Sequence, residues 1–246
     1  MTPTPIRRTA CAALFATALG ALAPVLTAHA QGYPAKPVQL VVPFPPGGAV
    51  DIVGRLISKK LGDQLGQPIV IENKGGAGTI VGASYVANAA ADGYTLLISS
   101  GSTFTVNPAL HAKLPYDPVK SYEPIGLVAR VPLILLAHRD VPVNDLKQLI
   151  AGVQARPGTY VYGSFGSGTT GHFAAELVWS AVGVKLMHVP YKGSAPAMSD
   201  LMGGQIPFTI DTVAAALPQL KSGKIKAIAV TGGTRATQLP DVPTVA

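Results

Sequence analysis

Short apolar runs alternate with amphipathic segments along almost the whole chain. The apolar runs, which predict strands, are Val38–Phe44, Pro68–Glu72, Thr95–Ser99, Ile125–Ala137, Thr159–Ser164, Lys185–Val189, Pro207–Asp211 and Ile225–Val230. The amphipathic segments, which predict helices, are Ala49–Leu65, Ile80–Ala91, Val143–Ala155, Thr170–Val182, Ala195–Gly203 and Val213–Ser222. Strands that are apolar throughout and are followed by helices are typical of parallel sheets covered on both faces. The pattern therefore predicts an α/β fold with parallel-type sheets.

One apolar segment, from Pro124 to Arg139, is much longer than a typical strand of about 5–6 residues. We expect it to serve two sheets in succession, crossing near Arg130–Leu133, with a return crossing near Ile225–Val230. Few residues remain after that return, so a later part of the first lobe is expected to be missing from the sequence. The predicted division is residues 31–132 in the first lobe, 133–224 in the second lobe and 225–246 back in the first lobe.

The first thirty residues have the pattern of a signal peptide. Arg7 and Arg8 form a basic start, Ala10 to Leu26 is an apolar core, and Ala28-His29-Ala30 matches the cleavage pattern A-x-A. A membrane anchor is disfavoured because a glycine and a proline interrupt the run, which is short for a span of about 20 residues. We therefore predict that residues 1–30 are removed and that the protein is periplasmic.

Composition excludes several classes of site. The mature chain of 246 − 30 = 216 residues has no cysteine, so it has neither disulfides nor thiolate metal sites. Loss of two arginines leaves 17 basic against 12 acidic residues, a net charge of +5. The basic residues are scattered, which argues against a nucleic-acid surface, but a mild positive balance helps to attract small anions.

The segment Pro45-Pro46-Gly47-Gly48 joins the first predicted strand to the first predicted helix. Glycines let backbone amides approach a ligand, and the following helix adds the positive end of its dipole. No lysine follows, so the phosphate-binding P-loop pattern is absent, and the corner suits a carboxylate. A turn that simply requires glycine is the alternative.

A second glycine corner, Gly166 to Thr169, leads into the helix predicted in the other lobe. Two such corners, one in each lobe, are expected to face each other across a cleft. The spacing G-x-G-x-x-G also fits a dinucleotide fingerprint, but no acidic residue follows the next strand, which ends at Lys192.

Catalytic patterns are weak. The nucleophile elbow G-x-S-x-G is missing, and the histidines do not have metal-ligand spacing. His172 and Glu176 could form an acid–base couple or, more commonly, a pair on one helix face. Asp211, at the end of a strand, could contact a ligand in the crevice of the sheet or could cap the next helix.

Several motifs together resemble the extracytoplasmic substrate-binding proteins of tripartite tricarboxylate transporters, also called Bug receptors. The likeness runs from Tyr33 to Ala246, and family members continue beyond it. The motifs are Val42–Asp51, Glu72–Gly78, Asp92–Leu97, Leu114–Val119, Gly166–His172, Val189–Gly193 and Leu239–Thr244.

The resemblance implies a type II, two-lobed periplasmic binding fold of the Venus-flytrap kind, with a ligand cleft between lobes. It implies a monomer without metal or cofactor that binds a small carboxylate (a di- or tricarboxylate, an amino acid or an aromatic acid) and serves a membrane permease. An exported α/β enzyme acting on a small organic acid is the alternative. Ile80 departs from the small or polar residue usual in the family, and its effect on specificity is open. The expected ligand-binding residues are Phe44, Pro46, Gly47, Gly48, Thr79, Ser100, Ser102, Ser164, Gly166, Ser167, Thr169, His172 and Asp211.

Overall fold

The computed structural model describes residues 32–245 of the 246-residue chain. Residues Lys36–Ala246 form one compact unit, while residues 32–35 belong to a separate N-terminal unit and have no helix or strand. The signal peptide predicted for residues 1–30 lies outside the described residues. Within the part that is described, no helix has both the length and the apolar character that crossing a membrane requires.

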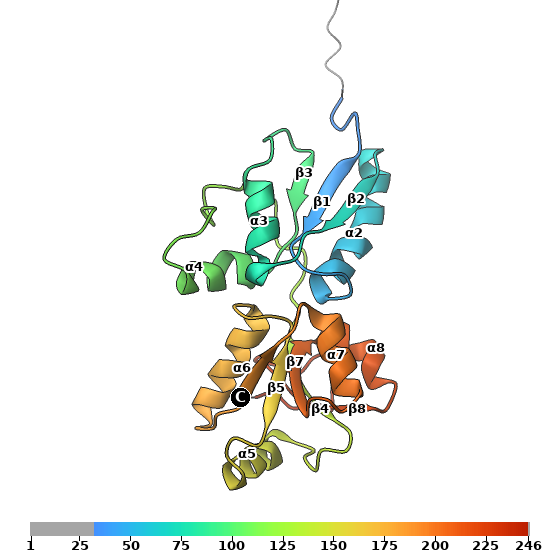
Figure 1. Cartoon of the computed structure of the whole chain (residues 1–246). Coiled ribbons are helices and arrows are strands. Elements are labelled where there is room, and N and C mark those ends of the chain that lie inside the picture. The colour runs from blue at the N-terminus through green and yellow to red at the C-terminus, as the bar shows by residue number, and fades with distance from the viewer. Residues whose placement is uncertain (1–31, 246) are drawn as a thin grey trace, which may run out of the picture. The chain divides into compact units, whose positions relative to one another are not determined.

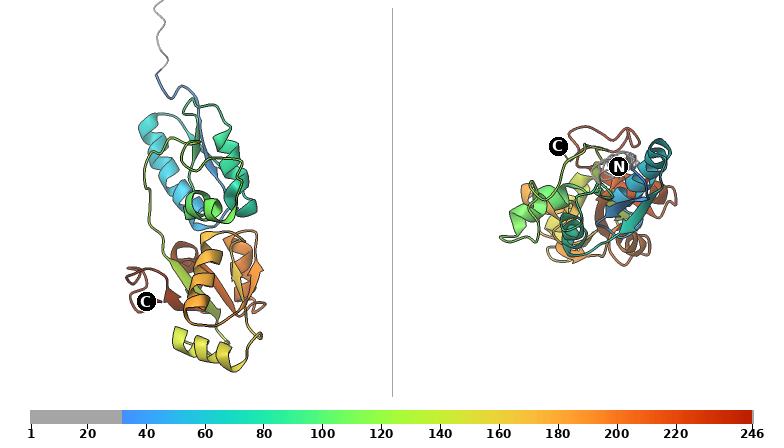
Figure 2. Two further views of the ribbon diagram at one scale, coloured as in Figure 1. Left: turned by 90° about the vertical axis from the view of Figure 1, so that its left-hand side faces the viewer. Right: turned by 90° about the horizontal axis from the view of Figure 1, so that it is seen from above.

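The first lobe is built on a sheet of three parallel strands (Figure 1). The strands, in spatial order, are β2 (Ile69–Asn73), β1 (Val38–Val42) and β3 (Thr95–Leu97). Helices α2 (Ala49–Leu65) and α3 (Ile80–Ala87) lie on opposite sides of this sheet (Figure 2). Leu40, Val42 and Ile98 form its buried core together with apolar side chains of α2.

The second lobe contains a five-stranded mixed sheet. Its strands, in spatial order, are β6 (Met187–Pro190), β5 (Val161–Ser164), β7 (Phe208–Thr212), β4 (Leu133–His138) and β8 (Ile225–Val230). Strands β5, β6 and β7 are parallel, but β4 runs antiparallel to both β7 and β8. The purely parallel arrangement that the alternating pattern predicts therefore holds for the first sheet and not for the second.

Strand β4 contributes to two hydrophobic clusters, one on each face of the second-lobe sheet. Alternate side chains of a strand point to opposite faces, and Leu135 packs with α5 and α6 whereas Ile134 and Leu136 pack with α7 and α8. Both faces of the sheet are thus covered, which explains why its strands are apolar throughout. The helices are α5 (Leu146–Ala155), α6 (Thr170–Ala181), α7 (Ser194–Met202) and α8 (Val213–Leu220).

Three short helical segments of the first lobe were not predicted from the sequence. They are the 3₁₀ turn η1 (Ala77–Thr79), the π-helical turn η2 (Ser102–Val106) and α4 (Asn107–Leu110). Each is too short to produce a clear helical period, and π-helical turns are often found at functional sites.

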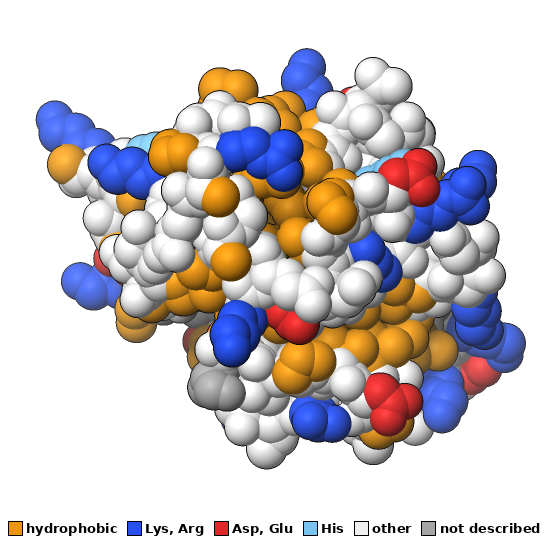
Figure 3. Space-filling view, turned by 90° about the horizontal axis from the view of Figure 1, so that it is seen from below, with side chains coloured by type: hydrophobic (Ala, Val, Ile, Leu, Met, Phe, Trp, Pro, Cys, Tyr) orange, Lys and Arg blue, Asp and Glu red, His pale blue; other side chains and the backbone are white. Residues whose placement is uncertain are grey.

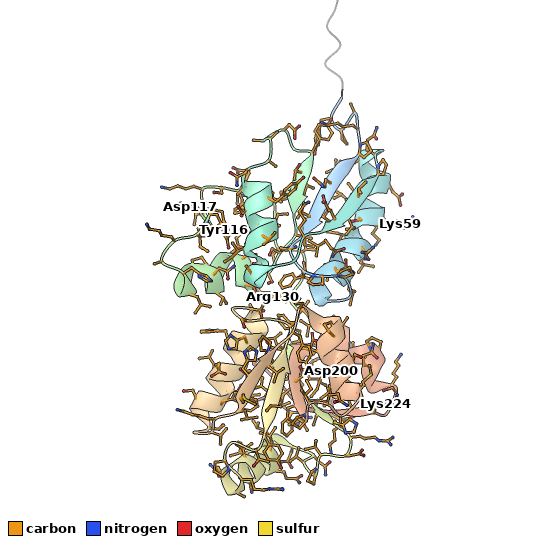
Figure 4. All side chains as sticks on the ribbon, in the orientation of Figure 1. Lys59, Tyr116, Asp117, Arg130, Asp200 and Lys224 are labelled. Carbon is orange, nitrogen blue, oxygen red and sulfur yellow. The ribbon has the colours of Figure 1, made fainter. Side chains whose placement is uncertain are left out.

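The prediction of one long strand from Ile125 to Ala137 is wrong in its first half. Residues 125–132 form no strand, Ile125 is 85% exposed and Leu127 is 73% exposed. Arg130 lies on this segment, which links the two lobes (Figure 4). An apolar pattern gives a strand only where a partner strand pairs with it, and the described residues provide none here.

The predicted return to the first lobe is also not observed. β8 pairs with β4 in the second sheet, and Thr244 forms a parallel bridge to Val230. Leu239 and Val242 pack against the core on the α7 and α8 side of that sheet. The position of β8 as a strand follows from its apolar residues, but the sheet that it joins depends on tertiary contacts.

Candidate ligand-binding site

A cavity of about 50 Å³ lies between loops of the two lobes. Its lining combines the first glycine corner with segments that follow β3, β5, β6 and β7 of the two sheets. The lining residues are Phe44, Pro45, Gly48, Ala49, Val50, Ser100, Phe165, Thr170, Gly193, Ser194, Asp211 and Thr212. A larger, open depression of about 390 Å³ near the far end of α2 includes Lys59 and Asp63, which pair with each other. It brings no convergent set of unpaired polar groups together, so the smaller cavity is the stronger candidate.

The N-terminal ends of four helices reach the cavity. Gly48 precedes α2, Thr170 begins α6, Ser194 begins α7, and Thr212 is the N-cap of α8. Free backbone amides and the helix dipole make such ends favourable for anions. The lining set contains no lysine or arginine. The cavity can therefore stabilise a negative group mainly through backbone dipoles.

The first glycine corner is held by Asp51, whose side chain is buried in the first turn of α2. Its carboxylate accepts hydrogen bonds from the Gly47 amide, from Arg55 Nε and from Asn73 Nδ2, each at 3.0 Å. Asn73 Nδ2 also donates to the Phe44 carbonyl at 3.0 Å. Burial acts to raise the pKa of Asp51, but the hydrogen bonds from Arg55, Gly47 and Asn73 together lower it below its ordinary value.

The amides of the second glycine corner are largely engaged within the protein. The Gly166 amide donates to Ser164 Oγ at 3.2 Å, and the Gly168 amide donates to His172 Nδ1 at 3.3 Å. The Thr170 amide donates to Ser102 Oγ at 3.0 Å, and Thr169 caps α6 through its hydroxyl. The resemblance implies that this loop holds the ligand largely through its amides, but most of them already have protein acceptors.

An aromatic stack supports the second corner from behind. The His188 ring lies 4.0 Å from the His172 ring and 4.9 Å from the Tyr162 ring, and His188 Nε2 is 2.7 Å from Ser164 Oγ. Burial, and then the neighbouring His172, lower the pKa of His188 to about 4, although Glu176 acts in the opposite direction. Glu176 accepts a hydrogen bond from the Tyr162 hydroxyl, so the expected His172–Glu176 pair is replaced by two separate contacts.

Asp211 is the acidic residue of the cavity lining and is 1% exposed. Its carboxylate accepts from the Ser194 hydroxyl and from the Thr212 amide, the latter at 2.7 Å. Burial raises the pKa of Asp211 to about 6, with the hydrogen bonds acting in the opposite direction. The helix cap of α8 is Thr212, which accepts from the Ala215 amide, so the alternative role of Asp211 as a cap is wrong by one residue.

Four consecutive residues before α3 have positive φ angles, ending with Thr79 at +87°. A β-branched residue in this region is strained, and such strain persists only where neighbours enforce it. Here Thr79 Oγ1 accepts from Thr103 at 2.7 Å and from Asn107 at 3.1 Å. Asn107 also donates to Tyr116 OH at 3.2 Å, while its Oδ1 is buried without a hydrogen-bond partner. A hydrogen-bond network of first-lobe side chains thus holds Thr79 in its strained conformation.

The structure brings four of the sequence-predicted residues to the cavity: Phe44, Gly48, Ser100 and Asp211. The others lie in the surrounding corners and supports, namely Pro46, Gly47, Thr79, Ser102, Ser164, Gly166, Ser167, Thr169 and His172. Among the lining residues that sequence reasoning missed are Phe165, whose ring meets that of Phe44 edge-on at 6.4 Å, and Ser194. Gly193 before α7 repeats the strand–glycine–helix pattern of the two corners, and this signal could have identified Ser194.

Charge and metal-binding patterns add no second site among residues 32–245. No group of three or more histidine, cysteine, aspartate or glutamate side chains is close enough to hold a metal ion there. On the face shown in Figure 3, the Lys and Arg side chains are distributed among apolar and neutral ones and form no continuous stripe.

Comparisons with known proteins identify the family of this chain. Residues 53–246 match the family model described as the tripartite tricarboxylate transporter family receptor. The protein BugT of Bordetella pertussis is 39% identical over 234 residues, covering 95% of this chain and 71% of BugT. The chain spans between 64% and 71% of the lengths of the first three curated relatives that it matches.

Solved structures with the same fold include two with bound acids. A Rhodopseudomonas palustris protein with adipate has a TM-score of 0.84 and 39% identity, covering 87% of this chain and 72% of that protein. MatC from Rhodopseudomonas palustris with bound malate has a TM-score of 0.81 and 36% identity, covering 86% of this chain and 72% of MatC. The family match and the similarity to BugT lead to one conclusion: this chain belongs to the tripartite tricarboxylate transporter receptor family.

Proposed function

We propose that this protein is a periplasmic receptor that captures a small carboxylate and presents it to the membrane permease of a tripartite tricarboxylate-type transporter. The observation that carries the proposal is the cavity at which four helix N-termini meet without a lysine or arginine in the lining. Backbone amides and helix dipoles favour an anion, and they do so without the long side chains that would have to be ordered on binding.

Affinity for an acid is expected to depend on the movement of the lobes. A cavity of about 50 Å³ is several times smaller than the ~300–1,000 Å³ of typical small-molecule sites. Ligand entry therefore requires the loops of the two lobes to separate and then close on the acid. A ligand that contacts both lobes stabilises the closed form by its differential affinity, and the closed form is what a permease recognises.

The second candidate function is an exported α/β enzyme acting on a small organic acid. The lining contains two polar pairs in contact, Ser194 with Asp211 and Asp211 with Thr212. A serine nucleophile needs an adjacent base that can accept its proton, usually a histidine. Neither histidine of the stack is a lining residue of the cavity. The geometry supports capture of the ligand without turnover.

The proposal is tested by calorimetric titration of the chain with malate, adipate, glutamate and benzoate. Proton NMR of the same mixtures shows whether any acid is consumed. We expect at least one acid to bind and to remain chemically unchanged. Consumption of a bound acid would establish the enzyme alternative, and absence of binding by every acid would reject the carboxylate site.

Gly48 offers a matched pair of variants. Its φ is −83°, and a Cβ there would meet only Ser194 Cβ, at 3.8 Å, so alanine fits without strain. A leucine side chain would extend toward the cavity and keep the ligand away from the first amides of α2. Each lost hydrogen bond to a charged group costs about 1.5–3 kcal/mol, so Gly48→Leu should lose about tenfold or more in affinity. Gly48→Ala should retain most of it, and equal affinities of the two variants would place the ligand elsewhere.

A further inference from the structure

A hydrogen bond joins the two lobes beside the cavity. The backbone amide of Thr170, the first residue of α6, donates to Ser102 Oγ of the first lobe at 3.0 Å. The same hydroxyl lies 3.5 Å from Thr170 Oγ1, and Ser102 is completely buried. Ser102 is not a lining residue of the cavity. A partly buried polar contact between residues 68 positions apart therefore links the lobes, with Thr170 at the edge of the cavity and the Ser102 hydroxyl behind it.

This contact completes the cap of α6. The first amides of a helix have no partner within the helix. Thr169 of the second lobe satisfies the His172 amide, and Ser102 of the first lobe satisfies the Thr170 amide. The cap of α6 is consequently shared between lobes, and separation of the lobes leaves the Thr170 amide without its acceptor.

A second contact lies close to the first. A Cβ built on Gly78 would lie 3.0 Å from the carbonyl oxygen of Ser167 and 3.5 Å from that of Gly168. Asn107 donates to the Gly78 carbonyl at 3.0 Å and so fixes the first-lobe side of this contact. Only a residue without a side chain lets the turn of the first lobe approach the second glycine corner so closely.

We infer that Ser102 is a positioning residue that latches the two lobes together by capping α6 from across the cleft, and that it sets ligand affinity without touching the ligand. The inference rests on the proposed receptor function, because closure of the lobes is what retains the acid. The Gly78 contact gives the latch its close fit, and the Ser102 hydroxyl gives it a directional bond.

The first test is backbone amide hydrogen exchange, measured by NMR without added ligand, in the whole chain and in Ser102→Ala. The Thr170 amide should exchange at least tenfold faster in the variant, while amides of β5 and β7 should be unchanged. Ser180→Ala, an exposed serine on the same helix, is the matched control and should exchange like the wild type. Gly78→Ala, which forces the two corners apart, should also accelerate exchange at Thr170.

The second test is affinity for malate as the probe. Loss of a neutral hydrogen bond from the closed state should weaken binding about two- to tenfold in Ser102→Ala and leave Ser180→Ala unchanged. Wild-type exchange at Thr170 in both Ser102→Ala and Gly78→Ala would overturn the latch and leave the receptor function standing. If neither the wild type nor any variant binds malate or the other acids, the proposed receptor function is wrong. Accelerated exchange at Thr170 in the variants would still establish the latch in that case.

Discussion

The carboxylate of Asp51 accepts a hydrogen bond from the backbone amide of Gly47 at 3.0 Å and thereby ties the first glycine corner to the first turn of α2. A carboxylate so close to a helix N-terminus competes with an anionic ligand for the positive end of the dipole. Arg55 offsets this charge through its own bond to Asp51 at 3.0 Å. The corner is therefore rigid, and its electrostatic preference for an external anion is retained.

Removing the Asp51 carboxylate should destabilise the protein and weaken ligand binding together. In Asp51→Ala the partly exposed Gly47 amide and the Asn73 side chain lose the buried carboxylate that accepts their hydrogen bonds, at a cost of about 0.5–1.5 kcal/mol for each bond. Because the folded-state pKa is lowered, the contribution of Asp51 is present at neutral pH and is lost as the pH falls through the folded pKa. Urea unfolding at pH 7 and at pH 3 measures the destabilisation and its pH dependence, and calorimetric titration with malate at pH 7 measures the loss of affinity.

Asp63→Ala is the matched control, because Asp63 lies on the same helix in an exposed pair with Lys59. Exposed pairs contribute about 0–1 kcal/mol, so this variant should unfold almost like the wild type. Equal destabilisation by the two substitutions would show that Asp51 has no special role at the corner.

Asp211 should give the protein a pH dependence of the opposite sign. Its folded pKa of about 6 lies above the ordinary value of 3.8, so the folded state holds a proton that the unfolded state releases. Stability should therefore fall as the pH rises from about 4 to about 6. Asp211→Asn can keep the contacts with Ser194 and Thr212, but it cannot titrate. As the pH rises, the free energy of unfolding of the variant should therefore increase relative to that of the wild type, by roughly 3 kcal/mol at most.

Proton uptake on ligand binding provides a second measurement of the titration of Asp211. A carboxylate in the same cavity raises the pKa of Asp211 further, so binding near pH 6 should take up protons. Calorimetry in two buffers with different ionisation enthalpies measures this uptake, which should be absent in Asp211→Asn. The same proton uptake in the wild type and the variant would assign it to another group.

The accuracy of the sequence-based fold differs between local and tertiary features. The bounds of α2 and β8 were predicted to the residue, because glycines and a clear apolar period mark the ends of α2 and a compact apolar run defines β8. The first half of the strand predicted over Ile125–Ala137 and the predicted return of the chain to the first lobe at β8 were wrong. Both depend on which strand becomes the partner, and a residue pattern does not contain that information.

The candidate site was likewise predictable only in its local parts. The two glycine corners follow from strand–glycine–helix patterns, and the structure places both beside one cavity. The supports of these corners were missed, since the contact of Asp51 with Asn73 and that of Ser102 with Thr170 join residues 22 and 68 positions apart. Such pairs have no sequence signature, because each partner is an ordinary polar residue in its own segment.

At the strained turn of Thr79, a glycine variant should be more stable than an alanine variant, which is the reverse of the usual order in a helix. At an ordinary helical position glycine is less stable than alanine by roughly 0.5–1 kcal/mol. Thr79 has a φ of +87°, and a side chain in such a conformation costs of order 1–3 kcal/mol. Both Thr79→Ala and Thr79→Gly lose the hydroxyl bonds, but only Thr79→Gly relieves the strain and should be the more stable of the two.

Ser84, inside α3, is the control position for the Thr79 comparison. Thermal or urea unfolding should show Ser84→Gly less stable than Ser84→Ala, the reverse of the order at Thr79. The same order at both positions would mean that the turn adopts an unstrained conformation in solution.

His188 should remain neutral well below the pH at which an ordinary histidine takes up a proton. Burial and the neighbouring His172 lower its pKa to about 4 from 6.5, so between these values the unfolded state binds a proton that the folded state does not. Acidification from pH 6.5 to pH 4 should therefore reduce stability, and His188→Gln should lose that part of the pH dependence. Ser164→Ala removes the hydrogen-bond partner at 2.7 Å but keeps the titrating ring, so its pH dependence should persist. A side-chain NMR titration of His188 with a midpoint near 6.5 would show that the stack behind the second glycine corner is open to water and would contradict the prediction.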